Sequence, residues 1–201
     1  VPFQLRSEAH RAAFFESSMM PVMLIVFLST VSYGGITTFL PLYAESIEVN
    51  VGTFFMVYAI SLTLTRPVAG KLSDRYGEVA VTVPALLIAV LALVVISLSS
   101  GLPGIILSAI LYGIGFGSSQ PAFQSIALRL ASPDRKGVAN ATFFTAFDLG
   151  IGLGSILLGW ISRYVGYPGI FTISAISVAG ALVIFWLALV KKLDRRVNLK
   201  V

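Results

Sequence analysis

The sequence predicts an all-α membrane protein whose chain crosses the bilayer six times. Of its 201 residues, 57% are hydrophobic and only 11% are charged, and the mean hydropathy is +0.92. A soluble domain carries roughly 25% charged residues, so this chain lacks the polar surface that water requires. Its long uncharged runs match the roughly 20 helical residues that cross a hydrocarbon core of about 30 Å. The lipid bilayer is therefore its expected surroundings.

The chain divides into a leader, a six-helix bundle over residues 18–190 and a tail. The leader, residues 1–17, is amphipathic, as in a cytoplasmic linker or a helix on a membrane surface. The uncharged run over residues 79–128 is too long for one crossing, and the turn-forming residues 99–104 divide it. The tail, residues 191–201, is basic. The expected spans are residues 18–44, 51–70, 80–98, 104–128, 138–162 and 169–190.

Basic residues predict the orientation. With six spans, the leader, the second and fourth loops and the tail lie on one side of the membrane. That side holds thirteen of the fourteen Lys and Arg residues, and the opposite side holds only Arg163. Cytoplasmic loops carry such an excess, so both ends of the chain are expected in the cytoplasm, with the bundle in the cell membrane. Because the basic residues lie between apolar spans rather than on one face, no nucleic-acid partner is expected.

The sequence argues against a membrane enzyme. The chain has no cysteine, and its one histidine, His10, precedes the first span. Thiol chemistry, a disulfide and a thiolate metal site are therefore excluded. No nucleophile, metal-ligand cluster or acid–base pair stands out within the spans, and no cofactor is expected.

Short echoes predict an internal repeat of three spans. Tyr33-Gly34 in the first span resembles Tyr112-Gly113 in the fourth. Gly70-x-Leu72-Ser73 at the end of the second span resembles Gly159-x-Ile161-Ser162 at the end of the fifth. Three-span repeats with inverted topology are typical of several transporter folds.

The charged stretch between the second and third spans carries a family resemblance. Gly70-x-Leu72-x-Asp74-Arg75-x-Gly77 resembles the signature loop of the major facilitator superfamily. The resemblance implies one half of a twelve-helix fold, and a loop that helps to switch the transporter between outward- and inward-facing states. Glu78 and Val79 stand where the family normally has basic residues, which suits the second, more degenerate copy of the loop. The implied conformational-switch residues are Arg66, Gly70, Asp74, Arg75 and Gly77.

The fifth span indicates which half this is. Its run from Asp148 to Ser155 resembles the glycine-rich fifth or eleventh helix of the family. A first half of a drug antiporter would usually show Gly-Pro near Gly154-Ser155. Together with a start that lacks Met and an amphipathic leader, this favours the C-terminal half, spans seven to twelve. The expected partner is the N-terminal six-helix half, on the same chain or on another.

Asp148 is the sharpest single signal in the spans. It lies 12 residues beyond Lys136, about 18 Å along a helix that rises 1.5 Å per residue, near mid-membrane. An ionised carboxylate there costs at least ~2.5–3.5 kcal/mol. A carboxylate held between apolar surroundings and a nearby cation or water can take up and release a proton. The alternative is a structural, hydrogen-bonded Asp at a helix contact.

Aromatic and uncharged polar side chains recur at helical spacing on four spans. Such stripes suit a cavity for an apolar or amphipathic ligand, although any one of these residues could simply hydrogen-bond between packed helices. The expected substrate-binding residues are Tyr33, Thr37, Tyr58, Gln120, Gln124, Asn140 and Phe144.

The resulting functional hypothesis is a secondary transporter of the antiporter type. It exports a small drug-like or amphipathic compound by alternating access, and Asp148 binds the proton or a cationic substrate. One alternative is a proton symporter or facilitator for a sugar or other metabolite. Another is a non-transporting membrane scaffold subunit.

Overall fold

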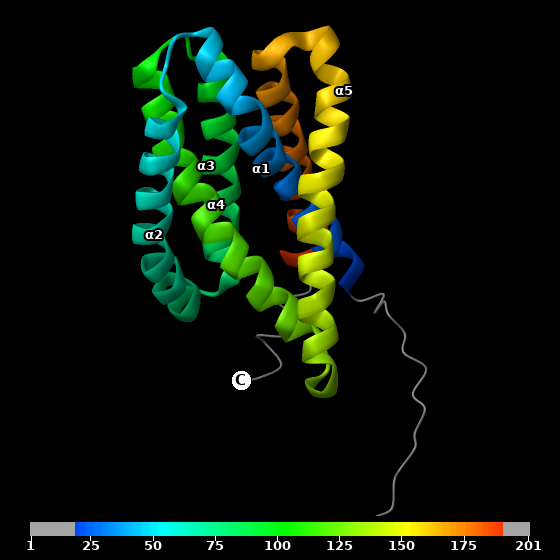
Figure 1. Ribbon diagram of the computed structural model, residues 1–201. Helices are drawn as coiled ribbons and strands as arrows, with labels where there is room; N and C mark the ends of the chain where they lie inside the picture. The colour runs from blue at the N-terminus through cyan, green and yellow to red at the C-terminus, as the bar shows by residue number, and fades with distance from the viewer. Residues whose placement is uncertain (1–18, 191–201) are drawn as a thin grey trace, which may run out of the picture.

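The computed structural model describes residues 19–190, and every regular element among them is a helix. The helices stand side by side as a bundle (Figure 1). They are α1 (Met20–Ser46), α2 (Val51–Tyr76), α3 (Glu78–Leu98), α4 (Leu102–Leu130), a 3₁₀ turn η2 (Pro133–Arg135), α5 (Lys136–Ile184) and a π-helical segment η3 (Phe185–Val190). The leader at residues 1–17 and the tail at residues 191–201 lie outside the described residues.

Helix α5 contains two membrane crossings. Five helical segments are long and apolar enough to cross a membrane, but α5 has 49 residues, about 74 Å at 1.5 Å per residue. That is more than twice the hydrocarbon core of about 30 Å. At Gly166 the backbone leaves the helical region, with φ 67° and ψ −179°, which glycine adopts readily. Figure 1 shows the chain turning back there, from yellow to orange. The predicted six-helix class is thereby confirmed.

The packing follows the predicted three-plus-three repeat. A Cβ added to Gly34 in α1 would lie 2.7 Å from the carbonyl oxygen of Ile151 in α5. A Cβ added to Gly113 in α4 would lie 2.8 Å from the carbonyl oxygen of Tyr58 in α2. Gly34 and Gly113 are corresponding positions in the two echoes. Exchanging the first span with the fourth, and the fifth with the second, therefore converts one helix contact into the other, as a repeat of this kind requires.

Residues 71–76, which we expected to lie in a cytoplasmic loop after the second span, instead continue helix α2 as far as Tyr76. Polarity moves a segment out of the lipid but does not end a helix, and this stretch holds good helix formers such as Lys71 and Leu72. Of the two glycines at the ends of the motif Gly70-x-Leu72-x-Asp74-Arg75-x-Gly77, Gly70 remains helical. Gly77 has φ 86° and ends the helix, its N–H donating to the Ser73 carbonyl at 2.9 Å. The expected loop is thus reduced to one turn between α2 and α3.

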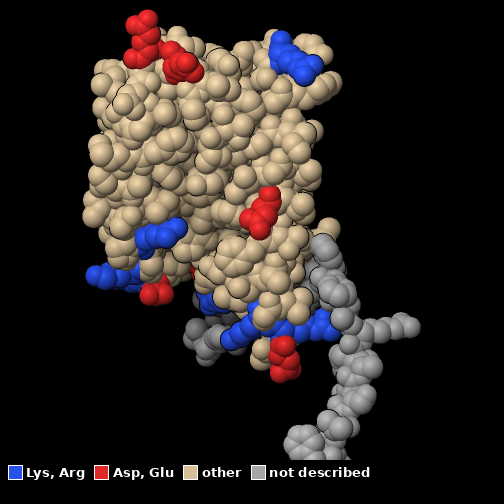
Figure 2. Space-filling model, viewed as in Figure 1, with Lys and Arg blue, Asp and Glu red and all other residues tan. Residues whose placement is uncertain are grey.

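Charged side chains mark the two ends of the bundle. In Figure 2 most of the visible Lys, Arg, Asp and Glu side chains gather at the two ends of the molecule, and the belt between them is largely uncharged. An acidic side chain is nevertheless visible in this belt. On α3, large apolar residues stay exposed at near-helical spacing along one side, at Leu87, Leu91, Val94 and Leu98. Such a belt suits a surface that meets lipid.

Candidate functional site

A cavity of about 370 Å³ opens between the second half of α2, the second half of α4 and the first turns of α5. We call it the aromatic cavity. Its volume lies within the range of about 300–1,000 Å³ typical of small-molecule sites. Its lining residues are Arg66, Phe116, Gln120, Pro121, Gln124, Phe143, Phe144 and Phe147. Three expected substrate-binding residues, Gln120, Gln124 and Phe144, meet there, together with Arg66.

Aromatic contacts extend from the wall of the aromatic cavity to α1 and α2. Tyr33 of α1 stacks on Phe116 with ring centroids 4.8 Å apart and planes 10° apart. The ring centroids of Phe116 and Phe147 are 6.4 Å apart, and those of Tyr33 and Tyr58 are 6.5 Å apart. The expected residue Tyr33 therefore contacts rings of the cavity wall and Tyr58 contacts Tyr33, although neither lines the cavity itself. Arrangements of this type add stabilisation beyond the area that the rings bury.

The two glutamines of α4 are in different states. Gln124 donates from Nε2 to Oδ1 of Asn140 on α5 at 2.8 Å, so two of the expected residues hold one another. Gln120, one turn earlier and only 8% exposed, has neither its Nε2 nor its Oε1 paired among the described residues. Buried amides are normally hydrogen-bonded, and leaving one unpaired costs about 1–3 kcal/mol. Gln120 therefore has unused hydrogen-bonding capacity in the cavity wall.

Thr37 and Asp148 are not among the residues that line the aromatic cavity. The Thr37 hydroxyl donates to the carbonyl of Tyr33 one turn earlier in α1, at 2.9 Å. Asp148 is exposed on α5, one turn beyond the cavity residue Phe144 and on the same side of the helix. Its carboxylate thus lies past the rim of the aromatic cavity, on the outer surface of this bundle.

The expected switch residues meet a smaller hollow of about 140 Å³ between α2, α3 and α4. Gly70 and Asp74 line it from α2, facing Ser118 and Ser125 of α4. Arg75 instead lies over the ring of its neighbour Tyr76, 5.3 Å from the centroid. One side of this end of α2 therefore lies beside α4, while Lys71, Leu72, Arg75 and Tyr76 on it stay exposed.

An ion pair next to this hollow was missed by the sequence reasoning. Arg129, near the end of α4, donates from Nη1 to both carboxylate oxygens of Glu78, the first residue of α3. The Ser125 hydroxyl donates to the same carboxylate at 3.1 Å. From the sequence, Arg129 was counted only among the thirteen basic residues on the cytoplasmic side. The available signal was Glu78 itself, an acid where the resembled family normally has a base.

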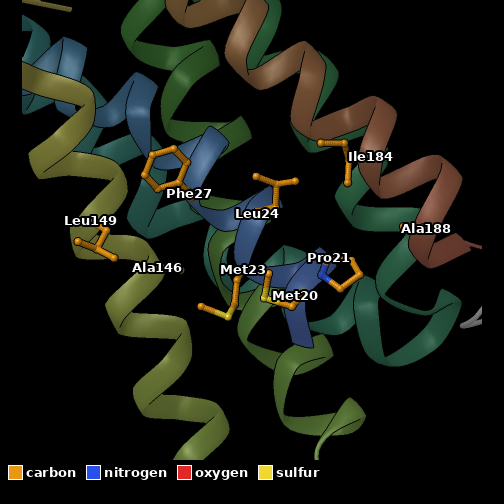
Figure 3. A pocket seen from close by; sticks show the side chains of 9 residues that line it. All are labelled: Met20, Pro21, Met23, Leu24, Phe27, Ala146, Leu149, Ile184 and Ala188. Atoms are coloured by element: carbon orange, nitrogen blue, oxygen red, sulfur yellow. The ribbon is translucent and has the colours of Figure 1, made fainter. Parts of the chain in front are cut away.

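A third hollow, of about 490 Å³, lies between the start of α1, the first half of α5 and the segment around the end of α5 and η3. Figure 3 shows apolar side chains on all its sides and no charged group among them. We call it the apolar groove. Its lining residues are Met20, Pro21, Met23, Leu24, Phe27, Ala146, Leu149, Ile184 and Ala188.

Comparisons with known proteins agree with this architecture. The family model described as "Major Facilitator Superfamily" matches residues 8–200. The multidrug resistance protein MdtG of Erwinia billingiae is 25% identical over 97% of this chain and 50% of its own length. The staphylopine export protein of Staphylococcus aureus is 28% identical over 90% of this chain and 46% of its own.

The solved structures show the same fold. A POT family transporter in complex with 5-aminolevulinic acid superimposes with a TM-score of 0.72 at 20% identity, covering 85% of this chain and 37% of that protein. At this identity the likeness concerns the fold alone. The chain spans about half the length of the curated relatives it matches. The chain therefore belongs to the major facilitator superfamily and is a half-length member by comparison with these relatives.

Proposed function

We propose that this chain is the C-terminal half of a secondary transporter that exports a small amphipathic compound by alternating access. The aromatic cavity is the observation that carries the proposal, because it brings ring faces, two amides and a guanidinium from three helices to one hollow of ligand size. The relatives named for multidrug resistance and for staphylopine export support the direction of transport. The N-terminal half would supply the rest of the binding site.

In this proposal Asp148 couples transport to protons. Its carboxylate is exposed on the outer side of α5, opposite the buried residues Ala146 and Gly150. Exposure to lipid at this depth would be costly for an ionised acid. We therefore place this face of α5 against the missing half, where water and neighbouring polar groups can reach the carboxylate. Uptake and release of a proton would then accompany the movement of the two halves.

The end of α2 acts as the switch. Gly70 and Asp74 line a small hollow against α4, and the Glu78–Arg129 pair joins the start of α3 to the end of α4. Rearrangement of these contacts would let the three helices move relative to the other half. The excess of basic residues supports a cytoplasmic location for this end of the bundle and for both ends of the chain.

Transport by the full-length protein that carries this chain tests the proposal. The protein is reconstituted in liposomes with an imposed pH gradient, and the movement of anionic and cationic amphipathic dyes is followed by fluorescence. Dye movement opposite to the proton flow is expected. Movement of dye and protons in the same direction would indicate a symporter. Absence of flux under every gradient would favour the scaffold subunit and end the transporter proposal.

A further inference from the structure

Arg66 has an unusual position for an arginine in this bundle. It lies on α2, ten residues before the end of the helix at Tyr76, and it lines the aromatic cavity. Among the residues that the structure describes, Arg129 forms an ion pair with Glu78, and no ion pair includes Arg66. Its side chain is exposed in this half-length bundle, and a guanidinium that faces a cavity within a membrane protein is costly unless water, an anion or several acceptors meet it.

The rest of the cavity wall contains no acid that could meet Arg66. The other lining residues are phenylalanines, one proline and two glutamines. Asp148 is not among them and lies beyond the rim. The cavity therefore carries a single formal charge on its walls within this half, and that charge is positive. A cationic ligand would be repelled there, whereas an anionic group would find a planar donor suited to carboxylates.

Gln120 adds a second feature that points to a ligand. Its amide is more than nine-tenths buried in the cavity wall, and neither its nitrogen nor its oxygen has a partner among the described residues. Gln124, by contrast, is already engaged by Asn140. A modest rotation of the Gln120 side chain would present a donor and an acceptor to a polar group in the cavity. Satisfying that amide would favour a bound molecule over an empty cavity.

We propose that the aromatic cavity is a subsite for small aromatic anions. In this inference, which rests on the proposed transport function, the ring of the ligand packs against Phe116, Phe144 and Phe147. Its acidic group binds the Arg66 guanidinium, and Gln120 accepts or donates a hydrogen bond to a polar substituent. Arg66, which the resemblance assigned to the switch alone, then determines which charge the substrate carries. The acidic Asp148 remains available for the proton.

Two probes with one ring system and opposite charges test the inference. The probes are 2-naphthoate and (2-naphthylmethyl)trimethylammonium, and their equilibrium binding to the purified full-length transporter in lipid nanodiscs is measured by calorimetry. The naphthoate is expected to bind more tightly. Arg66→Gln is expected to weaken naphthoate binding by at least about tenfold, as the loss of a charge-assisted hydrogen bond implies. Arg66→Lys keeps the charge and is expected to restore part of the affinity.

Arg163→Gln is the matched control, because Arg163 is an exposed arginine in the second half of α5, outside the cavity lining. Its naphthoate affinity should equal that of the unchanged protein. The thermal unfolding midpoint of each variant distinguishes a loss of naphthoate affinity from a loss of folded protein.

Three results would overturn the inference. They are tighter binding of the ammonium probe, an unchanged naphthoate affinity in Arg66→Gln, and no binding of either probe. If the liposome assay still shows coupled flux of another compound, the transport function survives and only the charge assignment fails. If no compound moves under any gradient, the transport function fails as well.

Discussion

The aromatic cavity and the apolar groove share helix α5, yet their walls have opposite chemical character. The groove is the larger, about 490 Å³ against about 370 Å³. Its sides are methionine, leucine, isoleucine and other apolar groups, which offer a ligand contact area but no directed interaction. The cavity presents an arginine and two amides among its rings. A specific site needs a few convergent polar groups in an apolar hollow, so the aromatic cavity is a better candidate than the apolar groove.

The difference arises from adjacent faces of one helix. Phe143 and Phe147 of α5 point to the cavity, whereas Ala146 and Leu149 line the groove. The polar groups of the cavity come from α2 and α4, and the groove is completed by α1 and η3, which supply none. The side chains that line a hollow in a membrane protein therefore say more about its ligand than its volume does. An apolar groove on a bundle that lies in lipid suits lipid chains.

The largest expected effect comes from Asp148, which lies beyond the cavity on the same side of α5. Asp148→Asn keeps the size of the side chain but cannot carry the proton, so proton-driven flux is expected to fall to the level of leak. The unfolding temperature should not change, because the side chain is exposed. Flux in the pH-gradient liposome assay measures this. Coupled flux equal to that of the unchanged protein would remove Asp148 from the mechanism.

The next effect concerns the contact that positions α5 against α1. A Cβ on Gly150 would lie 1.9 Å from Oγ1 of Thr30 and 2.6 Å from the carbonyl oxygen of Phe27. Gly150→Val is therefore expected to separate the helices and to lower stability by about 1–3 kcal/mol, as overpacking does. Both hollows should change shape together.

Gly152→Val is the matched control for that variant, because a Cβ at Gly152 meets no atom within 4 Å. It should unfold at a temperature no lower than that of the unchanged protein. Thermal unfolding in detergent compares the two. Equal stability of Gly150→Val and Gly152→Val would show that this α1–α5 contact does not set the helix spacing.

A pair of matched substitutions tests the comparison directly. Gln124→Leu removes a cavity amide and leaves Asn140 without its partner. The free energy of unfolding is expected to fall by about 1–3 kcal/mol and the apparent substrate affinity by about tenfold. Ala188→Leu adds apolar volume to the groove, where no directed contact is lost, and should leave the affinity within about twofold. Concentration dependence of dye flux gives both affinities. The reverse ranking would make the groove the binding site.

The smallest expected effect is at the Glu78–Arg129 pair. The Arg129 side chain is 53% exposed, so solvent screens the interaction even though the Glu78 side chain is only 9% exposed. Glu78→Gln is therefore expected to lower stability by at most about 1 kcal/mol. It should also change the proportion of outward- and inward-facing molecules, measured by cysteine cross-linking across the α2–α4 end. An unchanged proportion would limit the pair to a structural role.

Much of the site could be anticipated from side-chain spacing, and some could not. The i, i+4 spacing of Gln120 and Gln124 was enough to place them on one face of a helix, and the structure puts both at the aromatic cavity. Spacing could not tell that Gln124 is paired with Asn140 while Gln120 is unpaired, because that depends on another helix. The ion pair between Glu78 and Arg129 joins residues 51 positions apart, beyond the reach of any local pattern.

The sequence by itself determined that the chain lies in a lipid bilayer, how many times it crosses that bilayer and to which family it belongs. Composition and the lengths of uncharged runs depend only on what a bilayer demands of each segment taken alone. Tertiary structure decided that the polar stretch ending in Gly77 stays helical, that Arg66 belongs to the cavity and that Asp148 lies outside it. These outcomes depend on which helix faces pack together, and hydropathy is nearly blind to that choice because lipid and a neighbouring apolar helix reward the same side chains.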